Sequence, residues 1–501
     1  MNFANKKVLI FGLGRLGGGV ATALWLAKHK AEIRITDLLS QQALQASFRP
    51  LARLKDSKIK YILGHHRQQD INWADVIVVN PGVSYKHPLI QSARKKNKTI
   101  VNAGSLFFQA AQADVIAITG TRGKTTTTTW THHLIKNFYP KTILGGNQPD
   151  KALLKIISKT RKNNCAIVEL SSFQLEFYER ALKAPKIALI TNIYPDHLNR
   201  YQSLKEYALM KAKIFQNQSQ NEYLILNHDN DWTMFFLSLQ PKSQIYFFSL
   251  KPLSKNLNGL FVKNNYIYLQ INSDLKKFFS IKKFRQQWGE HNLCNLLASL
   301  TAAFLYYYSS GAPRHSLKYF RDRSLTAAIN KFKKLLSSLP QIKLRQEIIY
   351  KNKNLTVIND SAATAPEAVS QALRRFKSKH LILLTGGTDK NLDFKNLALE
   401  VKKTLSPRNI IFLRGSATRK LLKELKTIGF RYLEENICGN LKDCVSAALL
   451  ACRSQSKASG IILFSPGAAS FEKFKNEFDR GEQFNQLIKS LKESGINSGR
   501  S

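Results

Sequence analysis

Short runs of apolar residues recur along the chain and alternate with longer stretches that mix apolar and charged residues. Runs of about five apolar residues predict buried strands of a parallel sheet, and the mixed stretches between them have the length of crossover helices. The pattern therefore predicts an α/β protein. The predicted strands are 6–11, 33–37, 75–79, 115–118, 165–170, 187–193, 222–227, 355–360, 380–387, 409–413 and 460–467.

A glycine-rich turn follows the first predicted strand. It reads GLGRLG, with Gly12, Gly14 and Gly17, and Asp37 ends the second strand about twenty residues later. This spacing is typical of a dinucleotide-type fold, in which glycines let a phosphate approach a helix N-terminus. Taken alone, the motif fits NAD, a nucleotide sugar or a purely structural turn. The Asn-Pro-Gly turn at 80–82 follows another strand and is expected at the same crevice.

A second glycine-rich turn, TGTRGKTT, stands between an apolar strand and a helix-compatible stretch. The common phosphate loop G-x-x-x-x-G-K-[ST] needs a glycine where this chain has Ile118. Gly120, Gly123, Lys124 and Thr125 still supply a backbone anion nest, a cation for the phosphates and a hydroxyl for Mg²⁺. We therefore predict a nucleoside triphosphate site here.

Polar residues follow the strands after this loop. Glu169 ends one strand, where a buried carboxylate is costly unless a cation neutralises it. Asp196 and His197 follow the next strand and are candidates for contacts to magnesium or phosphate. Two polar strand ends beside a phosphate loop favour a metal–nucleotide centre.

These patterns divide the chain into three predicted domains, as expected at roughly 150 residues each. Residues 1–112 are predicted to form a Rossmann-like domain, and residues 113–342 a parallel sheet of the P-loop, ATP-binding type. Residues 343–501 are predicted to form a second Rossmann-like α/β domain.

Charge and cysteine content narrow the function classes. The chain carries 77 basic and 33 acidic residues, a net charge of +44 that attracts polyanions. Lysines and arginines are spread over the whole length without a zinc-finger, RRM or KH motif, so a dedicated nucleic-acid function is the weaker hypothesis. The five cysteines form no C-x-x-C pair, and no segment reads as a membrane span. We expect a cytoplasmic protein.

Eight motifs resemble those of the Mur ligases and occur in the order typical of that family, over nearly the whole chain. The loop of that family reads T-G-T-x-G-K-[ST], which accounts for Ile118. The closest resemblance is to the D-glutamate-adding branch, mainly through the second and the last motif. The motifs are GTRGKTT, ELSSFQLE, DHLNRY, YALMKAKIF, GEHNLCN, INDSAAT, LTGGTDKNLDF and SPGAASFEKFKNEFDRGEQF.

The resemblance implies an ATP- and Mg²⁺-dependent amide ligase of peptidoglycan precursor synthesis. ATP would phosphorylate the carboxylate of UDP-N-acetylmuramoyl-L-alanine, and the amine of D-glutamate would attack the acyl phosphate. The implied partners are these small molecules alone, with the protein acting as a monomer. The three domains would bind the UDP-substrate, ATP and the amino acid, in chain order.

The same resemblance assigns roles by position. Lys124, His197 and Lys211 are the implied catalytic residues. The implied metal ligands are Thr125, Glu169 and Lys211. The implied ATP contacts are Gly120, Thr121, Gly123, Lys124, Thr125, Thr126, Asn292, Asn295, Arg345 and Asp360. The implied UDP-substrate contacts are Gly12, Gly14, Asp37, Asn147 and His197, and those to D-glutamate are Thr364, Lys390 and Ser470.

Lys211 matches the lysine that these ligases carbamylate to make a carboxylate-like magnesium ligand. Lys213 lies two residues further on, so the assignment depends on the spacing K-x-x-I-F, and either lysine is otherwise a surface residue of a helix. Two departures from the family pattern fall in the implied glutamate pocket. Ala362 stands where a lysine is usual, and Glu477 where an aromatic is usual, with Phe478 next to it.

Three other hypotheses remain open at this point. One is another ligase of the superfamily with a different amino-acid specificity. The second is a nucleic-acid-binding P-loop ATPase that uses the positive charge, which would need clustered aromatic and basic residues on one face. The third is a non-catalytic protein with a relic nucleotide site, against which the joint retention of Lys124, Thr125, Glu169, His197 and Lys211 argues.

Overall fold

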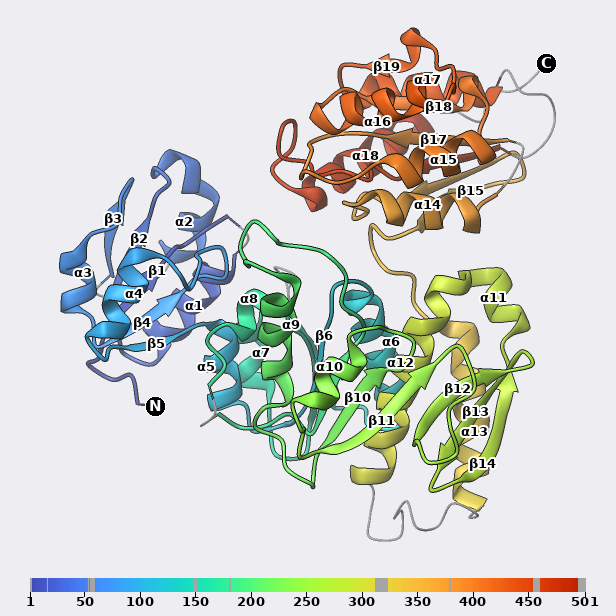
Figure 1. Cartoon of the computed structure of the whole chain (residues 1–501). Helices are drawn as coiled ribbons and strands as arrows, with labels where there is room; N and C mark the ends of the chain where they lie inside the picture. The colour runs from blue at the N-terminus through green and yellow to red at the C-terminus, as the bar shows by residue number, and fades with distance from the viewer. Residues whose placement is uncertain are drawn as a thin grey trace. The chain divides into compact units, whose positions relative to one another are not determined.

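The computed structural model describes residues 2–15, 17–52, 54, 59–146, 151–179, 182–310, 323–377, 380–453 and 460–493 (Figure 1). The chain forms two compact units, Met1–Pro340 and Gln341–Ser501, each of which is treated by itself below. None of the helices in the described part has the length and apolar character needed to cross a bilayer.

The first sheet has five parallel strands in the order β3-β2-β1-β4-β5. Its central strands β1 and β4 are apolar and buried except for the exposed Lys7 at the start of β1, as the hydrophobic runs predict. The elements are β1 (Lys7–Phe11), α1 (Gly18–Lys28), β2 (Glu32–Asp37), α2 (Gln45–Leu51), β3 (Ile59–Leu63), α3 (Gln68–Trp73), β4 (Val76–Val79), α4 (Pro88–Lys95), β5 (Thr99–Val101) and α5 (Ala103–Ala110).

The second sheet has nine strands in the order β14-β13-β12-β11-β10-β9-β6-β8-β7. The strands from β12 to β7 pair in parallel, whereas β13 and β14 add an antiparallel edge. The strands are β6 (Asp114–Thr119), β7 (Ile143–Gly145), β8 (Cys165–Glu169), β9 (Ile187–Ile190), β10 (Tyr223–Asn227), β11 (Gln244–Ser249), β12 (Gly259–Lys263), β13 (Tyr266–Ile271) and β14 (Asp274–Ser280). The helices are α6 (Lys124–Lys136), α7 (Leu153–Ile156), α8 (Ser172–Leu175), α9 (Leu204–Ala212), α10 (Thr233–Ser238), α11 (Lys282–Trp288), α12 (Glu290–Ser310) and α13 (Arg323–Leu335).

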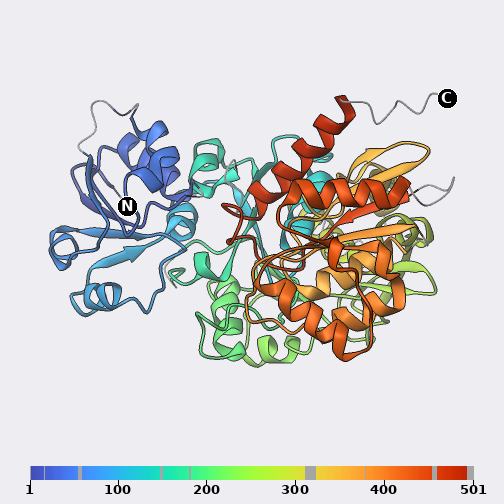
Figure 2. The same cartoon turned by 90° about the horizontal axis from the view of Figure 1, so that it is seen from above.

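The third sheet, in the C-terminal unit, has the order β15-β16-β20-β17-β18-β19, and only the edge strand β15 is antiparallel. The strands are β15 (Glu347–Lys351), β16 (Leu355–Asn359), β17 (Leu381–Thr385), β18 (Ile410–Leu413), β19 (Ile437–Cys438) and β20 (Gly460–Phe464). The helices are α14 (Pro366–Arg375), α15 (Lys395–Thr404), α16 (Ser416–Thr427), α17 (Leu441–Arg453) and α18 (Glu477–Glu493). Helices α14, α15 and α16 pack their apolar faces on one side of this sheet, and α17 and α18 on the other (Figures 1 and 2).

The α/β fold predicted from the sequence is confirmed, and every predicted strand lies on or next to an observed one. The strands β3, β5, β7, β11 to β15 and β19 were not predicted. The boundary near residue 112 stays a prediction, because the first two sheets share one hydrophobic cluster in which Leu106, Phe107 and Phe108 of α5 join the two sets of strands.

Candidate active site

The phosphate loop runs from the end of β6 to the start of α6. Gly120 has φ 143° and Gly123 has φ 80°, backbone values that L-residues rarely adopt. A Cβ at Gly120 would overlap Oγ1 of Thr191, and one at Gly123 would overlap Oδ1 of Asn295. The two glycines are therefore required by both conformation and space.

Hydrogen bonds from the end of β9 hold this loop in shape. The backbone N–H of Arg122 donates to Oδ1 of Asn192 (2.9 Å), and the N–H of Thr121 donates to its carbonyl (2.9 Å). The hydroxyl of Thr191 donates to the Arg122 carbonyl (2.7 Å). The loop conformation is thus fixed by its neighbours before a ligand arrives.

Lys124 lies across the same loop. Its ammonium donates to the carbonyls of Gly120 (2.9 Å) and Thr121 (3.0 Å). A bound triphosphate offers a stronger, charge-assisted acceptor than either carbonyl. The lysine is therefore placed to turn from the loop to a phosphate. The next residues differ in exposure: Thr126 is buried, whereas Thr125 is only half-buried.

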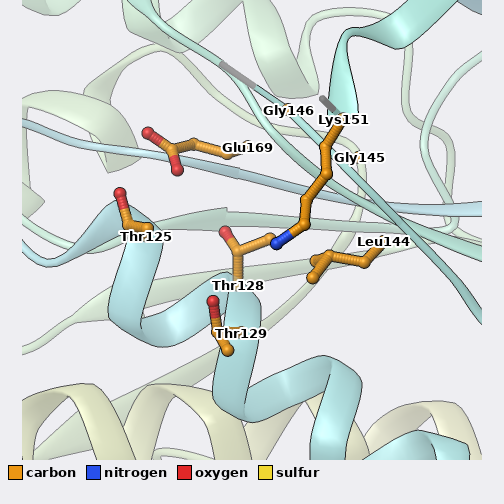
Figure 3. A pocket seen from close by; sticks show the side chains of 8 residues that line it. All are labelled: Thr125, Thr128, Thr129, Leu144, Gly145, Gly146, Lys151 and Glu169. Atoms are coloured by element: carbon orange, nitrogen blue, oxygen red, sulfur yellow. The ribbon is translucent and has the colours of Figure 1, made fainter. Parts of the chain in front are cut away.

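A pocket opens beside the start of α6. The parallel register of β6 with β8 pairs Ile118 with Glu169, which brings this carboxylate to the loop. Figure 3 shows the Glu169 carboxylate and the Thr125 hydroxyl on one side of the pocket, and the Lys151 side chain extending toward Thr128. The lining residues are Thr125, Thr128, Thr129, Leu144, Gly145, Gly146, Lys151 and Glu169.

The oxygen donors of this pocket fit Mg²⁺. The ion is usually held by one or two carboxylates and substrate phosphates, with several waters kept. Glu169 supplies a carboxylate of which only 7% is exposed, and Thr125 supplies a hydroxyl. Within the described residues, no group of three or more His, Cys, Asp and Glu side chains could form a closed metal cage. The donor set therefore suits an ion shared with a nucleotide.

Lys211 is fully buried near the same strand ends, with 0% of it exposed. Its Nζ lies 3.4 Å from Oγ1 of Thr119 and 4.6 Å from the centre of the Tyr207 ring. Burial lowers the pKa of Lys211 well below its usual value, and the positive charge of Lys124 lowers it further. The amine is thus favoured in its neutral, nucleophilic form. Lys213 has different surroundings, because its Nζ donates to the carbonyl of Glu176 (2.7 Å).

His197 stands between β9 and α9. Its backbone has φ 55°, and its ring packs edge-on against Phe173 (centroids 4.8 Å apart) and Tyr207 (6.0 Å). Its Nε2 is 3.8 Å from Oδ2 of Asp196. The imidazole, which is 39% exposed, therefore has a defined orientation and an accessible face.

Asn292 and Asn295 project from α12 toward the phosphate loop. The Asn295 amide donates to Oδ1 of Asn292 (3.0 Å), and the Thr127 hydroxyl donates to Oδ1 of Asn295 (3.4 Å). The Asn292 amide donates to the carbonyl of Trp288 (2.9 Å). Asn295, far from the loop in sequence, is therefore next to it in space, and Asn292 is hydrogen-bonded to Asn295.

The glycine turn of the first sheet is closed by Asp37. Its Oδ2 accepts the backbone N–H groups of Leu13 (2.8 Å) and Gly14 (2.9 Å), and a Cβ at Gly12 would crowd Asn80. Asn80 and the glycine turn thus meet at one edge of the sheet, as predicted. Asp37 supports the turn, and its contact to a UDP-substrate stays a prediction. Asn147 lies outside the described residues.

Asp360 follows β16 in the C-terminal unit. Its carboxylate accepts the Gln346 N–H (3.1 Å) and the Ser465 hydroxyl (2.7 Å). Burial raises the pKa of Asp360 to about 7, although the Ser465 hydrogen bond opposes this shift. Arg345 is exposed on the segment before β15. The predicted ATP contacts of both residues stay predictions.

A second pocket in this unit contains Ser470, one of the three residues assigned to D-glutamate. Its hydroxyl is buried and finds no hydrogen-bond partner among the described residues. The other two do not line this pocket: Lys390 is exposed and Thr364 is half-buried. The lining residues are Gly387, Thr388, Leu413, Arg414, Ala469, Ser470, Glu472, Lys473, Phe474 and Arg480.

Comparison with known proteins identifies the family. Residues 118–303 match the Mur ligase middle domain, and residues 6–102 match the N-terminal domain of MurD-like Mur ligases. A UDP-N-acetylmuramoylalanine–D-glutamate ligase of Roseiflexus sp. (strain RS-1) is 32% identical over 495 residues, covering 98% of this chain and 100% of that protein. The chain belongs to the Mur ligase family. The proteins of that name from Borreliella burgdorferi (strain ZS7) and Geobacter metallireducens are 32% and 29% identical, over 97% and 98% of this chain and 98% and 99% of theirs.

Solved structures of other Mur ligases share the fold. MurF from Acinetobacter baumannii aligns with a TM-score of 0.53 at 15% identity, covering 98% of this chain and 91% of that one. The MurF ligase of Thermotoga maritima, solved with ADP, aligns with a TM-score of 0.53 at 12% identity, covering 98% and 96%. The family resemblance drawn from the eight motifs is therefore confirmed.

Several pocket residues of this Mur ligase were given no role from the sequence, among them Lys151, Thr129 and Arg480. Lys151 and Thr129 line the first pocket, and Arg480 lines the second. Arg480 is fully buried and donates to the carbonyls of Ser361 (2.8 Å) and Ala468 (3.0 Å). Burial lowers the pKa of Arg480 to about 10. Lys151 offered one signal, since it follows the glycines that end β7.

Proposed function

We propose that this Mur ligase is an ATP-dependent enzyme that joins D-glutamate to UDP-N-acetylmuramoyl-L-alanine and releases ADP and phosphate. The observation that carries the proposal is the full-length likeness to D-glutamate ligases in a chain whose phosphate loop faces Glu169 and Lys211. The product is a peptidoglycan precursor. The substrates are cytoplasmic metabolites, so we place the reaction in the cytoplasm, with the protein acting as a monomer.

The chemistry needs an activated carboxylate, because a free carboxylate is a poor acyl donor. A carboxylate oxygen of the L-alanyl group attacks the γ-phosphorus of ATP, and the bond to the bridging oxygen of ADP breaks. The amine of D-glutamate then attacks the acyl carbon, loses a proton and expels phosphate. Phosphoryl transfer depends mostly on positioning and charge neutralisation. Lys124 would supply both at the γ-phosphate, together with backbone N–H groups of the loop other than those of Thr121 and Arg122, which bond Asn192.

The residues beside the loop would support this transfer. Mg²⁺, when bound, neutralises the phosphate charge and orients the γ-phosphoryl group. Thr125 and Glu169 would hold it. The neutral amine of Lys211 can react with CO₂ to form a carbamate, which would add an anionic oxygen ligand. His197 would contact the UDP-substrate from the segment after β9.

We assign the remaining roles by domain. Residues 1–112 would bind the UDP end of the substrate through the turn with Gly12, Gly14 and Asp37, and Asn147 of the central domain would contact its sugar. Residues 113–342 would bind ATP, aided by Asn292 and Asn295, and by Arg345 and Asp360 from the next domain.

Residues 343–501 would bind D-glutamate. An amino acid with two carboxylates needs cationic and hydroxyl donors, and Thr364, Lys390 and Ser470 supply them. The buried, unpartnered hydroxyl of Ser470 supports this role most directly, because such a group favours a ligand acceptor. Ala362 and Glu477 depart from the family pattern in this domain, so the identity of the amino acid is the part of the proposal to test first.

The test is phosphate release from Mg²⁺-ATP and UDP-N-acetylmuramoyl-L-alanine with D-glutamate and each of the twenty common amino acids in turn. The proposal predicts phosphate release only with D-glutamate. The product should have the summed mass of UDP-N-acetylmuramoyl-L-alanine and D-glutamate less one water. Release with another amino acid would keep the ligase reaction and reject the assigned substrate.

A further inference from the structure

Arg200 lies between β9 and α9 and forms a buried bidentate ion pair. Its Nε donates to Oε1 of Glu176 (2.8 Å) and its Nη2 donates to Oε2 (2.6 Å). The Arg200 side chain is 10% exposed and that of Glu176 is 0% exposed. Tyr201 adds a hydrogen bond from its hydroxyl to Oε1 of Glu176 (2.9 Å). Two N–H groups of the planar guanidinium therefore match the two carboxylate oxygens of Glu176.

The other N–H groups of Arg200 reach the first sheet. Its Nη1 donates to the carbonyl of Pro81 (2.8 Å), and its Nη2 donates to the carbonyl of Val83 (2.7 Å). These carbonyls belong to the loop 80–86, which follows β4 and begins at Asn80. The Asn80 amide donates to the carbonyl of Leu13 in the glycine turn (3.4 Å), and a Cβ at Gly12 would crowd the Asn80 side chain. One guanidinium thus joins the segment after β9 to the loop beside the turn that we assign to the UDP-substrate.

The same guanidinium also touches the surroundings of His197. It stacks on the ring of Phe173 at 4.1 Å, and that ring packs against the imidazole of His197. The chain from Arg200 to His197 is only three residues long, and the backbone N–H of Arg200 donates to the His197 carbonyl (2.9 Å). Any displacement of Arg200 would therefore move His197.

A second link runs parallel to the first. The Tyr85 hydroxyl donates to Oε1 of Glu206, and the Lys86 ammonium lies 2.8 Å from the same oxygen. Glu206 stands in the first turn of α9, the helix that carries Lys211 in its last turn. The loop 80–86 is therefore tied at two points, Arg200 and Glu206, to the segment from His197 to Lys211.

We infer that Arg200 is a positioning residue that couples occupancy of the UDP-substrate crevice to the geometry of the ATP site. This inference rests on the proposed function of the two sites. A buried arginine shared by a carboxylate and two carbonyls of another sheet transmits shifts, because each contact is short and directional. Binding of a UDP-substrate against the loop 80–86 then changes the position of His197 and α9, and reciprocally.

The test measures binding and needs no turnover. The dissociation constant of UDP-N-acetylmuramoyl-L-alanine is measured by calorimetry on the full chain, with and without a saturating non-hydrolysable ATP analogue and Mg²⁺. We expect the analogue to change this constant about 5- to 150-fold in the wild type. Arg200→Lys keeps the charge beside Glu176 but lacks the planar fork, so this ratio should fall to within about twofold of one.

Arg34→Lys is the matched control. Arg34 pairs with the buried Asp70 in the first sheet (3.1 Å) and stacks on Trp73 at 4.0 Å, without contact to the loop 80–86. The same substitution there should leave the wild-type ratio unchanged.

A wild-type ratio near one, or an unchanged ratio in Arg200→Lys, would overturn the inference. A fall in thermal stability of Arg200→Lys with the ratio retained would show a merely structural arginine and would overturn it as well. Failure of the proposed function gives a different result. A protein that does not ligate D-glutamate can still show the change in the dissociation constant in the wild type and its loss in Arg200→Lys.

Discussion

Replacing Lys211 by methionine should stabilise the protein while removing its activity. Methionine keeps the unbranched length of the lysine side chain, so no large cavity forms. Among the described residues, the buried amino group makes one long hydrogen bond, to Thr119 at 3.4 Å, and contacts the ring of Tyr207. Burying a poorly paired polar group costs about 1–3 kcal/mol. We therefore expect Lys211→Met to raise the free energy of unfolding by about that amount in CO₂-free, Mg²⁺-free buffer.

The difference between wild type and Lys211→Met should depend on pH. Burial lowers the folded-state pKa of Lys211 below its unfolded value of about 10.4. Between these two values the unfolded state binds more protons, so the wild type gains stability as the pH rises. The variant lacks this group. Its advantage in denaturant unfolding should thus be largest at the lower pH and should decrease as the pH rises toward 10.

The same variant should lose most of its ligase activity, by about 100-fold or more if the carbamate holds the metal. Lys213→Met is the control, because the Lys213 ammonium bonds the carbonyl of Glu176 and no other group among the described residues, and it should keep activity within a few-fold. Activity is measured as phosphate release in bicarbonate buffer. An active Lys211→Met protein, or one destabilised by more than about 2 kcal/mol as core truncations are, would refute the reasoning.

Three further variants test the rest of the site. Lys124→Met should lower kcat about 100- to 1,000-fold, while calorimetry shows unchanged binding of UDP; retained turnover would remove the loop from the mechanism. Gly123→Ala places a side chain at φ 80° and against Asn295, which costs roughly 1–2 kcal/mol of strain. This strain should raise the KM for ATP about tenfold. An unchanged KM would contradict the loop geometry. The pKa of Asp360 is raised to about 7, so the folded state binds more protons than the unfolded state between about pH 4 and 7, and this group lowers stability as the pH rises. Asp360→Asn should therefore flatten the dependence of the thermal unfolding temperature on pH. An identical pH dependence would disprove the shift.

The predictable part of the site lies at the ends of parallel strands. Short apolar runs marked β6, β8 and β9, and the polar residue after each run marked one edge of the sheet. Glu169 meets the phosphate loop because the parallel register places it beside Ile118. The spacing of the motif also separated Lys211 from Lys213, and the two lysines indeed have different surroundings.

Among the missed strands, β11, β12 and β13 are rich in apolar residues, whereas β14 mixes apolar residues with charged ones. Strand β14 reads DLKKFFS, and its residues are exposed or half-buried except Phe279, so it resembles a loop in sequence. The turns that bound it and β13 place Asn264, Asn265, Asn272 and Ser273 at positive φ. Asparagine pairs of this kind favour tight hairpin turns and offered a usable signal.

Side-chain contacts to distant backbone carbonyls could not be predicted. Arg200 bonds carbonyls 119 and 117 residues away in the chain, and Arg480 bonds one that is 119 residues away. Neither partner set has a sequence pattern, because backbone carbonyls are present in every residue type. The role of a buried arginine becomes visible only when the strands are assembled.

The central claim is ligation through an acyl phosphate, and isotope transfer tests it most directly. UDP-N-acetylmuramoyl-L-alanine with both carboxylate oxygens labelled as ¹⁸O is incubated with the protein, Mg²⁺-ATP and D-glutamate, and the released phosphate is analysed by mass. The account predicts one ¹⁸O in each phosphate released and one in the new amide. Unlabelled phosphate formed alongside ligated product would contradict the acyl phosphate, and phosphate released without any ligated product would contradict the ligase itself.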